Sequence, residues 1–95
     1  MNKYEAMFII KPDLSEEDKK ELFHQISDAV SKNSGMVTSA SIWTEKRKLF
    51  FPLKKYKEGT YYLVNFSLPP LGIQVLRNTY RLNENILRVL ITKQE

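Results

Sequence analysis

The chain has 95 residues, a length that allows one domain with a single two-layer core. Hydrophobic residues make up 42% and charged residues 27%, which argues against intrinsic disorder, and the absence of cysteine excludes disulfides and thiol chemistry. The N-terminal residues lack the apolar core of a signal peptide, and no apolar run approaches the ~18 residues of a membrane span. We therefore expect a cytosolic protein.

Positive charge is concentrated in one segment, although the formal net charge is only +4. Six basic residues and no acid lie between positions 46 and 57: Lys46, Arg47, Lys48, Lys54, Lys55 and Lys57. The rest of the chain holds nine basic against all 11 acidic residues. Such local charge favours an anionic partner, with nucleic acid as the first class to consider, although a solvated lysine-rich loop is the plain alternative.

The first half of the chain predicts a strand followed by a helix. Residues 4–10 (YEAMFII) predict a short strand that ends before Pro12. Ser15 predicts a helix N-cap, because three acids follow it in the first turn. The helix runs to about Asn33, and Gly35 predicts a left-handed stop. Its apolar residues recur at helical spacing: Leu22, Phe23, Ile26, Ala29 and Val30.

The second half predicts two strands, a helix and a last strand. Residues 36–53 have no helical period and predict one long strand, for which regular pairing and a bulge both remain open. A turn over residues 54–59 leads to a strand over residues 60–68. Two prolines then begin a helix that ends near Leu82, and residues 86–92 predict the last strand.

This order, β-α-β-β-α-β, predicts a single domain over residues 1–95 of the α+β class. We expect the ferredoxin-like fold, a four-stranded antiparallel sheet with two helices on one face. The other face is then bare, and it carries large apolar side chains that we assign to a protein-partner face: Met7, Ile9, Tyr61, Leu63 and Leu90. Covering of that face by the chain itself is the alternative.

The side chains that catalysis needs are scarce. One histidine, His24, and no cysteine exclude zinc ligation and Cys/His nucleophile pairs. The acids at Glu16, Glu17 and Glu21 fit the first turns of a helix better than an acid/base pair. Three glycines in total cannot form a phosphate-binding loop. We therefore predict a binding protein that is not an enzyme and needs no cofactor or metal.

The order of elements invites comparison with the RNA-recognition motif, which stacks bases on aromatic residues of its sheet. The corresponding strand here has Glu58 where that motif has a basic residue and Thr60 where it has an aromatic one. Stacking of bases on the sheet is therefore not supported. We expect the basic residues of the long hairpin to contact RNA phosphates instead.

Several segments, in order, resemble the family of the bacterial small-subunit ribosomal protein numbered six over essentially the whole chain. They are Lys3-Tyr4-Glu5, Phe8-Ile9, Pro12-Asp13, Gly35, Lys46-Arg47-Lys48-Leu49, Phe51-Pro52-Leu53, Gly59, Tyr61-Tyr62 and the run from Arg81 to Arg88. The chain departs from the family pattern at Glu45, where glycine is usual, at Trp43, where tryptophan is displaced by one residue, and at Phe50 and Phe51, which replace Ala and Tyr. Strand geometry should differ locally there.

The resemblance implies a structural, ferredoxin-like protein of the cytoplasmic ribosome. Its implied partners are the central domain of the small-subunit ribosomal RNA and ribosomal protein eighteen, the latter in a heterodimer. The residues assigned to RNA are Lys3, Tyr4, Lys46, Arg47, Lys48, Lys54, Lys55, Arg88 and Lys93. For Arg81, an ion pair with a nearby acid is an equal alternative to contact with RNA. The apolar segment 49–53 would anchor the long strand in the core and the interface.

One alternative comes from a different class of protein. A ferredoxin-like module that dimerises through its sheet and binds or senses a small molecule would also expose an apolar face. It would need polar groups that converge between subunits, and the sequence shows no obvious set.

Overall fold

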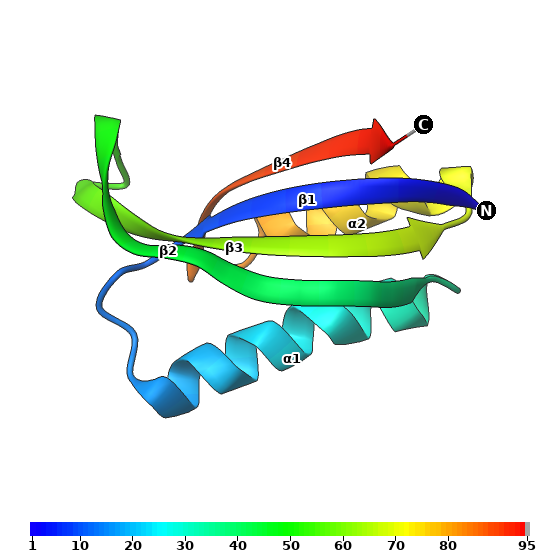
Figure 1. The fold of residues 1–95 in the computed structure, drawn as a ribbon, viewed down its shortest axis with the longest axis horizontal. Coiled ribbons are helices and arrows are strands. Elements are labelled where there is room, and N and C mark those ends of the chain that lie inside the picture. The colour runs from blue at the N-terminus through cyan, green and yellow to red at the C-terminus, as the bar shows by residue number, and fades with distance from the viewer. Residues whose placement is uncertain (95) are drawn as a thin grey trace.

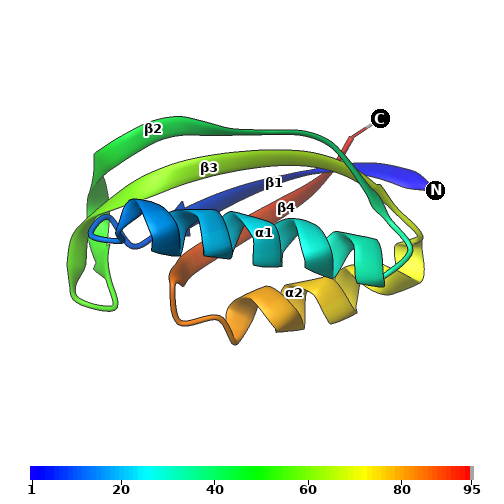
Figure 2. The same cartoon turned by 90° about the horizontal axis from the view of Figure 1, so that it is seen from below.

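The computed structural model describes residues 1–94. Its elements are β1 (Asn2–Ile10), α1 (Glu16–Lys32), β2 (Met36–Leu53), β3 (Tyr56–Leu68), the 3-10 turn η1 (Pro70–Gly72), α2 (Ile73–Arg81) and β4 (Ile86–Gln94). The strands lie in the order β2-β3-β1-β4, and all neighbours are antiparallel (Figure 1). Both helices cover the same face of the sheet (Figure 2). The predicted ferredoxin-like α+β fold is confirmed.

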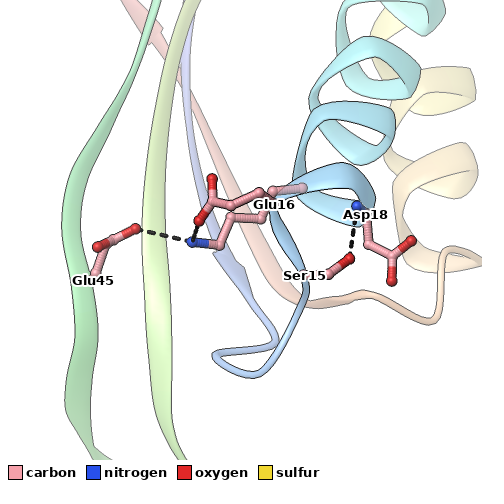
Figure 3. Close-up of polar contacts among 5 residues, drawn as sticks. Ser15, Glu16, Asp18 and Glu45 are labelled. Atoms are coloured by element: carbon pink, nitrogen blue, oxygen red, sulfur yellow. Dashed lines mark hydrogen bonds and ion pairs between the residues drawn. The ribbon is translucent and has the colours of Figure 1, made fainter.

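Helix α1 begins as the sequence predicted. Ser15 has extended backbone angles, and its Oγ accepts a hydrogen bond of 3.1 Å from the amide of Asp18 (Figure 3). This satisfies one of the amides that a helix leaves free at its start, while the acids of the first turn face the positive end of the helix dipole. The buried stripe consists of Leu22, Ile26, Ala29 and Val30.

The end of α1 differs from the prediction. The left-handed residue is Ser34, with φ of 65°, and no glycine of the described chain has a positive φ. Gly35 is needed for another reason, because an added Cβ would lie 2.5 Å from the carbonyl oxygen of Ser67 and 2.6 Å from Leu68. The glycine therefore lets the chain pass close to β3, and the prediction of a glycine stop at Gly35 was wrong.

The core lies between the helices and the sheet and is built from alternate residues of β1 and β3. In β1 the inward residues Ala6, Phe8 and Ile10 are fully buried. Tyr80 of α2 packs edge-on against Phe8 at 4.8 Å, and its hydroxyl donates a 2.7 Å hydrogen bond to the carbonyl of Ile26. This contact joins α2, α1 and β1, and burial raises the pKa of the Tyr80 phenol well above its ordinary value.

The hairpin between β2 and β3 is longer and tighter than predicted. Its turn consists of Lys54 and Lys55 alone, both with positive φ (47° and 73°), as in a two-residue type I′ turn. β3 therefore begins at Tyr56, and the predicted turn over residues 54–59 was wrong. The tip extends beyond the rest of the sheet and bends away from it (Figure 1).

Strand β2 is bulged, which decides between the two geometries left open by the sequence. The pairing register shifts between Thr44 and Arg47, and Lys46 at this bulge has φ of 49°. An extra residue in one strand of a pair increases its local twist and redirects the side chains that follow. No residue of β2 is buried. No helix within residues 1–94 is long and apolar enough to cross a lipid bilayer.

Candidate nucleic-acid and protein interface

The hairpin exposes all five of its residues that were assigned to RNA. They are Lys46, Arg47, Lys48, Lys54 and Lys55. The ion pairs found within residues 1–94 join Lys19 to Glu16 and Glu45, and Lys32 to Asp28. In this part of the chain no carboxylate therefore neutralises a hairpin cation, which leaves these charges available to an anionic partner.

The hairpin cations point in several directions. Arg47 lies over the rings of Trp43 and Tyr61, with its guanidinium carbon 5.1 Å and 5.7 Å from the ring centres. These cation–π contacts hold Arg47 over the face of the sheet that the helices leave bare. Lys46 instead lines a hollow beside the start of α1. Lys54 reaches towards β4, where its Nζ donates to the carbonyl of Ile86 at 3.4 Å.

The other four residues assigned to RNA do not join one site. Arg88 lies opposite Ile9, whereas Lys3 lies opposite Gln94 at the far end of the sheet. Ile9 and Lys3 are six positions apart along the strand, a distance of about 20 Å. Lys93 lies opposite Tyr4, at the same far end as Lys3. The sheet thus carries basic residues near the hairpin and two more near the chain ends, where Lys3 and Lys93 point to opposite faces.

Tyr4 is a correction to the predicted RNA residues. Its side chain is only 7% exposed, and its ring stacks on Phe66 with 5.6 Å between centres. It lies on the helix-covered face because alternate residues of β1 point to opposite sides of the sheet. An aromatic ring buried in this way cannot stack on a base, so Tyr4 belongs to the core.

The apolar segment 49–53 is a second correction. Phe50 and Phe51 are 101% and 80% exposed, so they do not anchor β2 in the core. Between Lys48 and Leu53 the pairing with β3 is irregular, and this part of the hairpin projects past the helices that could cover it (Figure 1). Leu49 and Leu53 are only half-buried. Two exposed phenylalanines beside lysines form a surface suited to contact with a partner.

The five residues assigned to a protein partner all lie on the bare face. Met7 is opposite both Leu63 of β3 and Leu90 of β4, and Ile9 is opposite Tyr61. Leu90 is 57% exposed and the other four are half-buried. These five residues form an apolar band across β3, β1 and β4. The next row towards the chain ends is polar or charged and consists of Glu5, Asn65 and Thr92, and Arg88 ends the row of Ile9 and Tyr61.

Within residues 1–94 the structure shows no group of three or more His, Asp or Glu side chains that could hold a metal ion. It does bring together two cations that the sequence did not select. Arg77 and Arg81 of α2 line a hollow at the edge of β4 with Arg88 and Lys54. No local signal in the sequence joins these residues, because they come from three elements and meet only in the folded chain.

Comparisons with known proteins agree with this geometry. The family model described as ribosomal protein S6 matches residues 3–93. The small ribosomal subunit protein bS6 of Caldanaerobacter subterraneus is 36% identical over 95 residues, which cover all of this chain and 99% of that protein. The protein of the same name from Dictyoglomus turgidum is 39% identical, over all of this chain and 97% of its own.

A solved structure supports the same assignment. The crystal structure of 30S ribosomal protein S6 from Thermotoga maritima matches with a TM-score of 0.88 and 28% identity, over 98% of this chain and 87% of that one. The predicted location, on the ribosome in the cytoplasm of bacteria, agrees with these matches. The resemblance inferred from the sequence is confirmed, and the chain belongs to the ribosomal protein S6 family.

Proposed function

We propose that the protein is a non-catalytic structural component of the small ribosomal subunit. It binds the central domain of the small-subunit ribosomal RNA, and it does so as a heterodimer with ribosomal protein eighteen. The observation that carries the proposal is the protruding hairpin, whose exposed cations are not neutralised by carboxylates within residues 1–94. Family membership supports the same conclusion.

The hairpin contacts the phosphate backbone of the RNA. Its lysines lie on a projecting ribbon, where long side chains reach a polyanion without any rearrangement of the core (Figure 1). Base stacking on a sheet requires exposed aromatic rings, and the two that lie together on the bare face, Trp43 and Tyr61, both lie under the guanidinium of Arg47. In the apolar band only Tyr61 is aromatic, and Arg47 already lies over its ring. RNA recognition therefore depends on phosphates and on shape.

The apolar band contacts the protein partner. Leu90, Met7 and Leu63 lie side by side across β4, β1 and β3, and their exposed carbon would be removed from water by a second chain. Burial of an exposed leucine contributes about 1.5–3 kcal/mol, which makes Leu90 the residue of the band with most to gain.

The RNA contact is tested by filter binding of a central-domain RNA fragment across a salt series, with and without the partner. The slope of log K against log salt is negative, and the double variant Lys48→Gln/Lys55→Gln should reduce its magnitude by about 1.5, since each phosphate contact contributes about 0.7–0.9. The control, Lys20→Gln/Lys32→Gln, removes the same charge from the exposed surface of α1. RNA affinity that does not depend on salt would contradict the proposal.

The protein contact is tested by co-purification with ribosomal protein eighteen and by light scattering. Leu90→Lys should abolish the heterodimer, because a charge would be buried without a partner. Leu71→Lys is the matched control, since Leu71 is 93% exposed and lies on η1, away from the sheet. A stable homodimer of the chain alone, lost in Leu90→Lys, would favour the self-associating module instead.

A further inference from the structure

A basic hollow of about 410 Å³ lies along the free edge of β4. Strand order makes β4 an outer strand, with β1 as its only neighbour in the sheet (Figure 1). Four cations line the hollow: Lys54 from the hairpin turn, Arg77 and Arg81 from α2, and Arg88 from β4. None of its lining residues is an acid. This hollow with its four cations is the edge hollow.

In the described part of the chain, two arginines of the edge hollow, Arg81 and Arg88, form no contact that would explain them by stability alone. Arg77 and Arg81 are four residues apart on α2, where two like charges repel each other and weaken a helix. Arg81 and Arg88 are exposed, and within residues 1–94 neither side chain forms an ion pair or a hydrogen bond to a protein group. An anion placed between these side chains would relieve the repulsion.

Two of the cations also change what the edge of β4 can bind. Arg77 Nη2 donates to the carbonyl of Ile91, and Lys54 Nζ donates to the carbonyl of Ile86, both at 3.4 Å. An added β-strand needs free carbonyls on the edge as well as free amides. With these two carbonyls occupied by cations, the edge offers fewer acceptors and carries positive charge beside it. This combination disfavours a peptide strand and suits an oxyanion.

From this geometry we infer that the edge hollow binds a phosphate group of the RNA backbone, as a second phosphate site beside the hairpin. The inference rests on the proposed function and adds Arg77 and Arg81 to the RNA-binding surface. Guanidinium groups present paired N–H donors that match two oxygens of one phosphate. Lys54 lies in the hairpin turn and also lines the hollow, so one RNA strand can pass from the hairpin to the edge of β4.

Arg81→Gln is the first test, because Arg81 caps no carbonyl and its loss leaves the β4 edge intact. Filter binding of the central-domain RNA fragment should weaken about tenfold, and the salt slope should fall by about 0.7–0.9. Arg81→Lys should restore the slope but only part of the affinity, since lysine keeps the charge and lacks the paired donors. Lys20→Gln, on the exposed surface of α1, is the matched control and should change neither quantity.

The outcomes separate this inference from the proposed function. Wild-type protein that binds the RNA without salt dependence overturns both. Wild-type binding with a normal slope that Arg81→Gln and Arg88→Gln leave unchanged overturns the edge hollow alone. Weaker binding of ribosomal protein eighteen with an unchanged RNA slope would make the hollow a protein site, which also overturns the inference.

The edge hollow could also bind free phosphate in place of a phosphate group of RNA. Titration of inorganic phosphate at constant ionic strength distinguishes the two. Saturable binding of inorganic phosphate, combined with an RNA slope that Arg81→Gln does not alter, would identify a site for free phosphate and overturn the RNA assignment. Thermal melting of each variant provides the folding control. Arg88→Gln, in a different element from Arg81→Gln, should reproduce the loss of slope.

Discussion

Strands β1 and β2 belong to one sheet but differ in what their residues do. In the nine residues of β1, every inward side chain from Tyr4 to Ile10 is buried. In the 18 residues of β2, none is buried, and the register against β3 shifts four times. β1 has a partner strand on each side, whereas β2 is an outer strand whose hairpin end extends past the helices (Figure 1).

Under the proposed function, stability and binding are carried by separate residues. The inward residues of β1 and β3 are closed to any partner, and the exposed residues of the hairpin contribute little burial to the fold. Substitutions in the first group should therefore change the free energy of unfolding, and those in the second should change binding. Substitutions in the two regions can test that separation.

The sharpest comparison uses one side-chain type in both regions. Phe8→Ala should lower the free energy of unfolding by about 3–5 kcal/mol, because Phe8 is fully buried and its loss leaves a cavity. Phe50→Ala should change it by less than about 0.5 kcal/mol, since Phe50 is fully exposed. Denaturant unfolding measures both. Similar losses in the two variants would mean that the hairpin is packed against the core in solution.

Gly35→Ala tests the close approach of the chain to β3. The added methyl group would meet the carbonyl oxygen of Ser67, which belongs to a paired strand and cannot easily move. We expect a loss of about 1–3 kcal/mol in the free energy of unfolding. Ser34→Gly is the matched control and should be neutral or slightly stabilising, because Ser34 holds the positive φ. A loss in Ser34→Gly with none in Gly35→Ala would restore the glycine stop.

Tyr80→Phe tests the hydrogen bond that joins the two helices. The free energy of unfolding should fall by about 1 kcal/mol, because the carbonyl of Ile26 keeps its bond within α1 and loses only the one from the phenol. Denaturant unfolding at pH 7 measures the loss. An unchanged midpoint would mean that water replaces the hydroxyl.

The same variant has a pH signature. The pKa of Tyr80 is raised in the folded state, so its unfolded phenol ionises near pH 10 while the folded phenol stays protonated. The stability that this residue supplies is therefore complete below pH 10 and declines as the pH rises above it. The difference between wild type and Tyr80→Phe should narrow above pH 10. A difference that is constant from pH 8 to pH 11 would contradict the raised pKa.

The burial pattern of β1 and α1 could be predicted from the sequence because it depends on the spacing of neighbouring residues. Alternation in residues 4–10 and the helical stripe with its Ser15 cap each fix which side chains turn inward, whatever the rest of the chain does. The same alternation placed Met7 and Leu63 on the bare face. It also shows why Tyr4 belongs to the core, since Tyr4 shares its side with Ala6 and Phe8.

The hairpin and the edge hollow could not be predicted because their properties depend on distant segments. An apolar run such as residues 49–53 predicts burial only where something covers it, and neither helix reaches that part of β2 (Figure 2). The predicted turn was too long because Lys54 and Lys55 form a two-residue turn with positive φ, for which the sequence offers no glycine or asparagine as a signal. Arg77 and Lys54 line the same hollow only after β4 has been placed beside β1.

One ion-pair network joins the two regions, and it should have the smallest effect. Lys19 of α1 donates to Glu45 at the β2 bulge at 3.0 Å and to Glu16 at 3.3 Å; Figure 3 shows Glu45 on β2 and Glu16 at the start of α1, each joined by a dashed line to the same nitrogen. The hydrogen bond to Glu45 raises the pKa of Lys19, against the opposing effect of partial burial. Because both glutamates are solvent-exposed, Glu45→Gln and Glu16→Gln should each cost less than about 0.5 kcal/mol.

The double variant Glu16→Gln/Glu45→Gln should cost more than the sum of the two, because each single variant leaves Lys19 one carboxylate and the double leaves none. The excess should shrink as salt is raised, since screening weakens exposed pairs most. Denaturant unfolding of the wild type, the two single variants and the double variant, at low and at high salt, gives the double-mutant cycle. Strict additivity would show that Lys19 does not hold β2 against α1, and that the hairpin and the core are independent even where they touch.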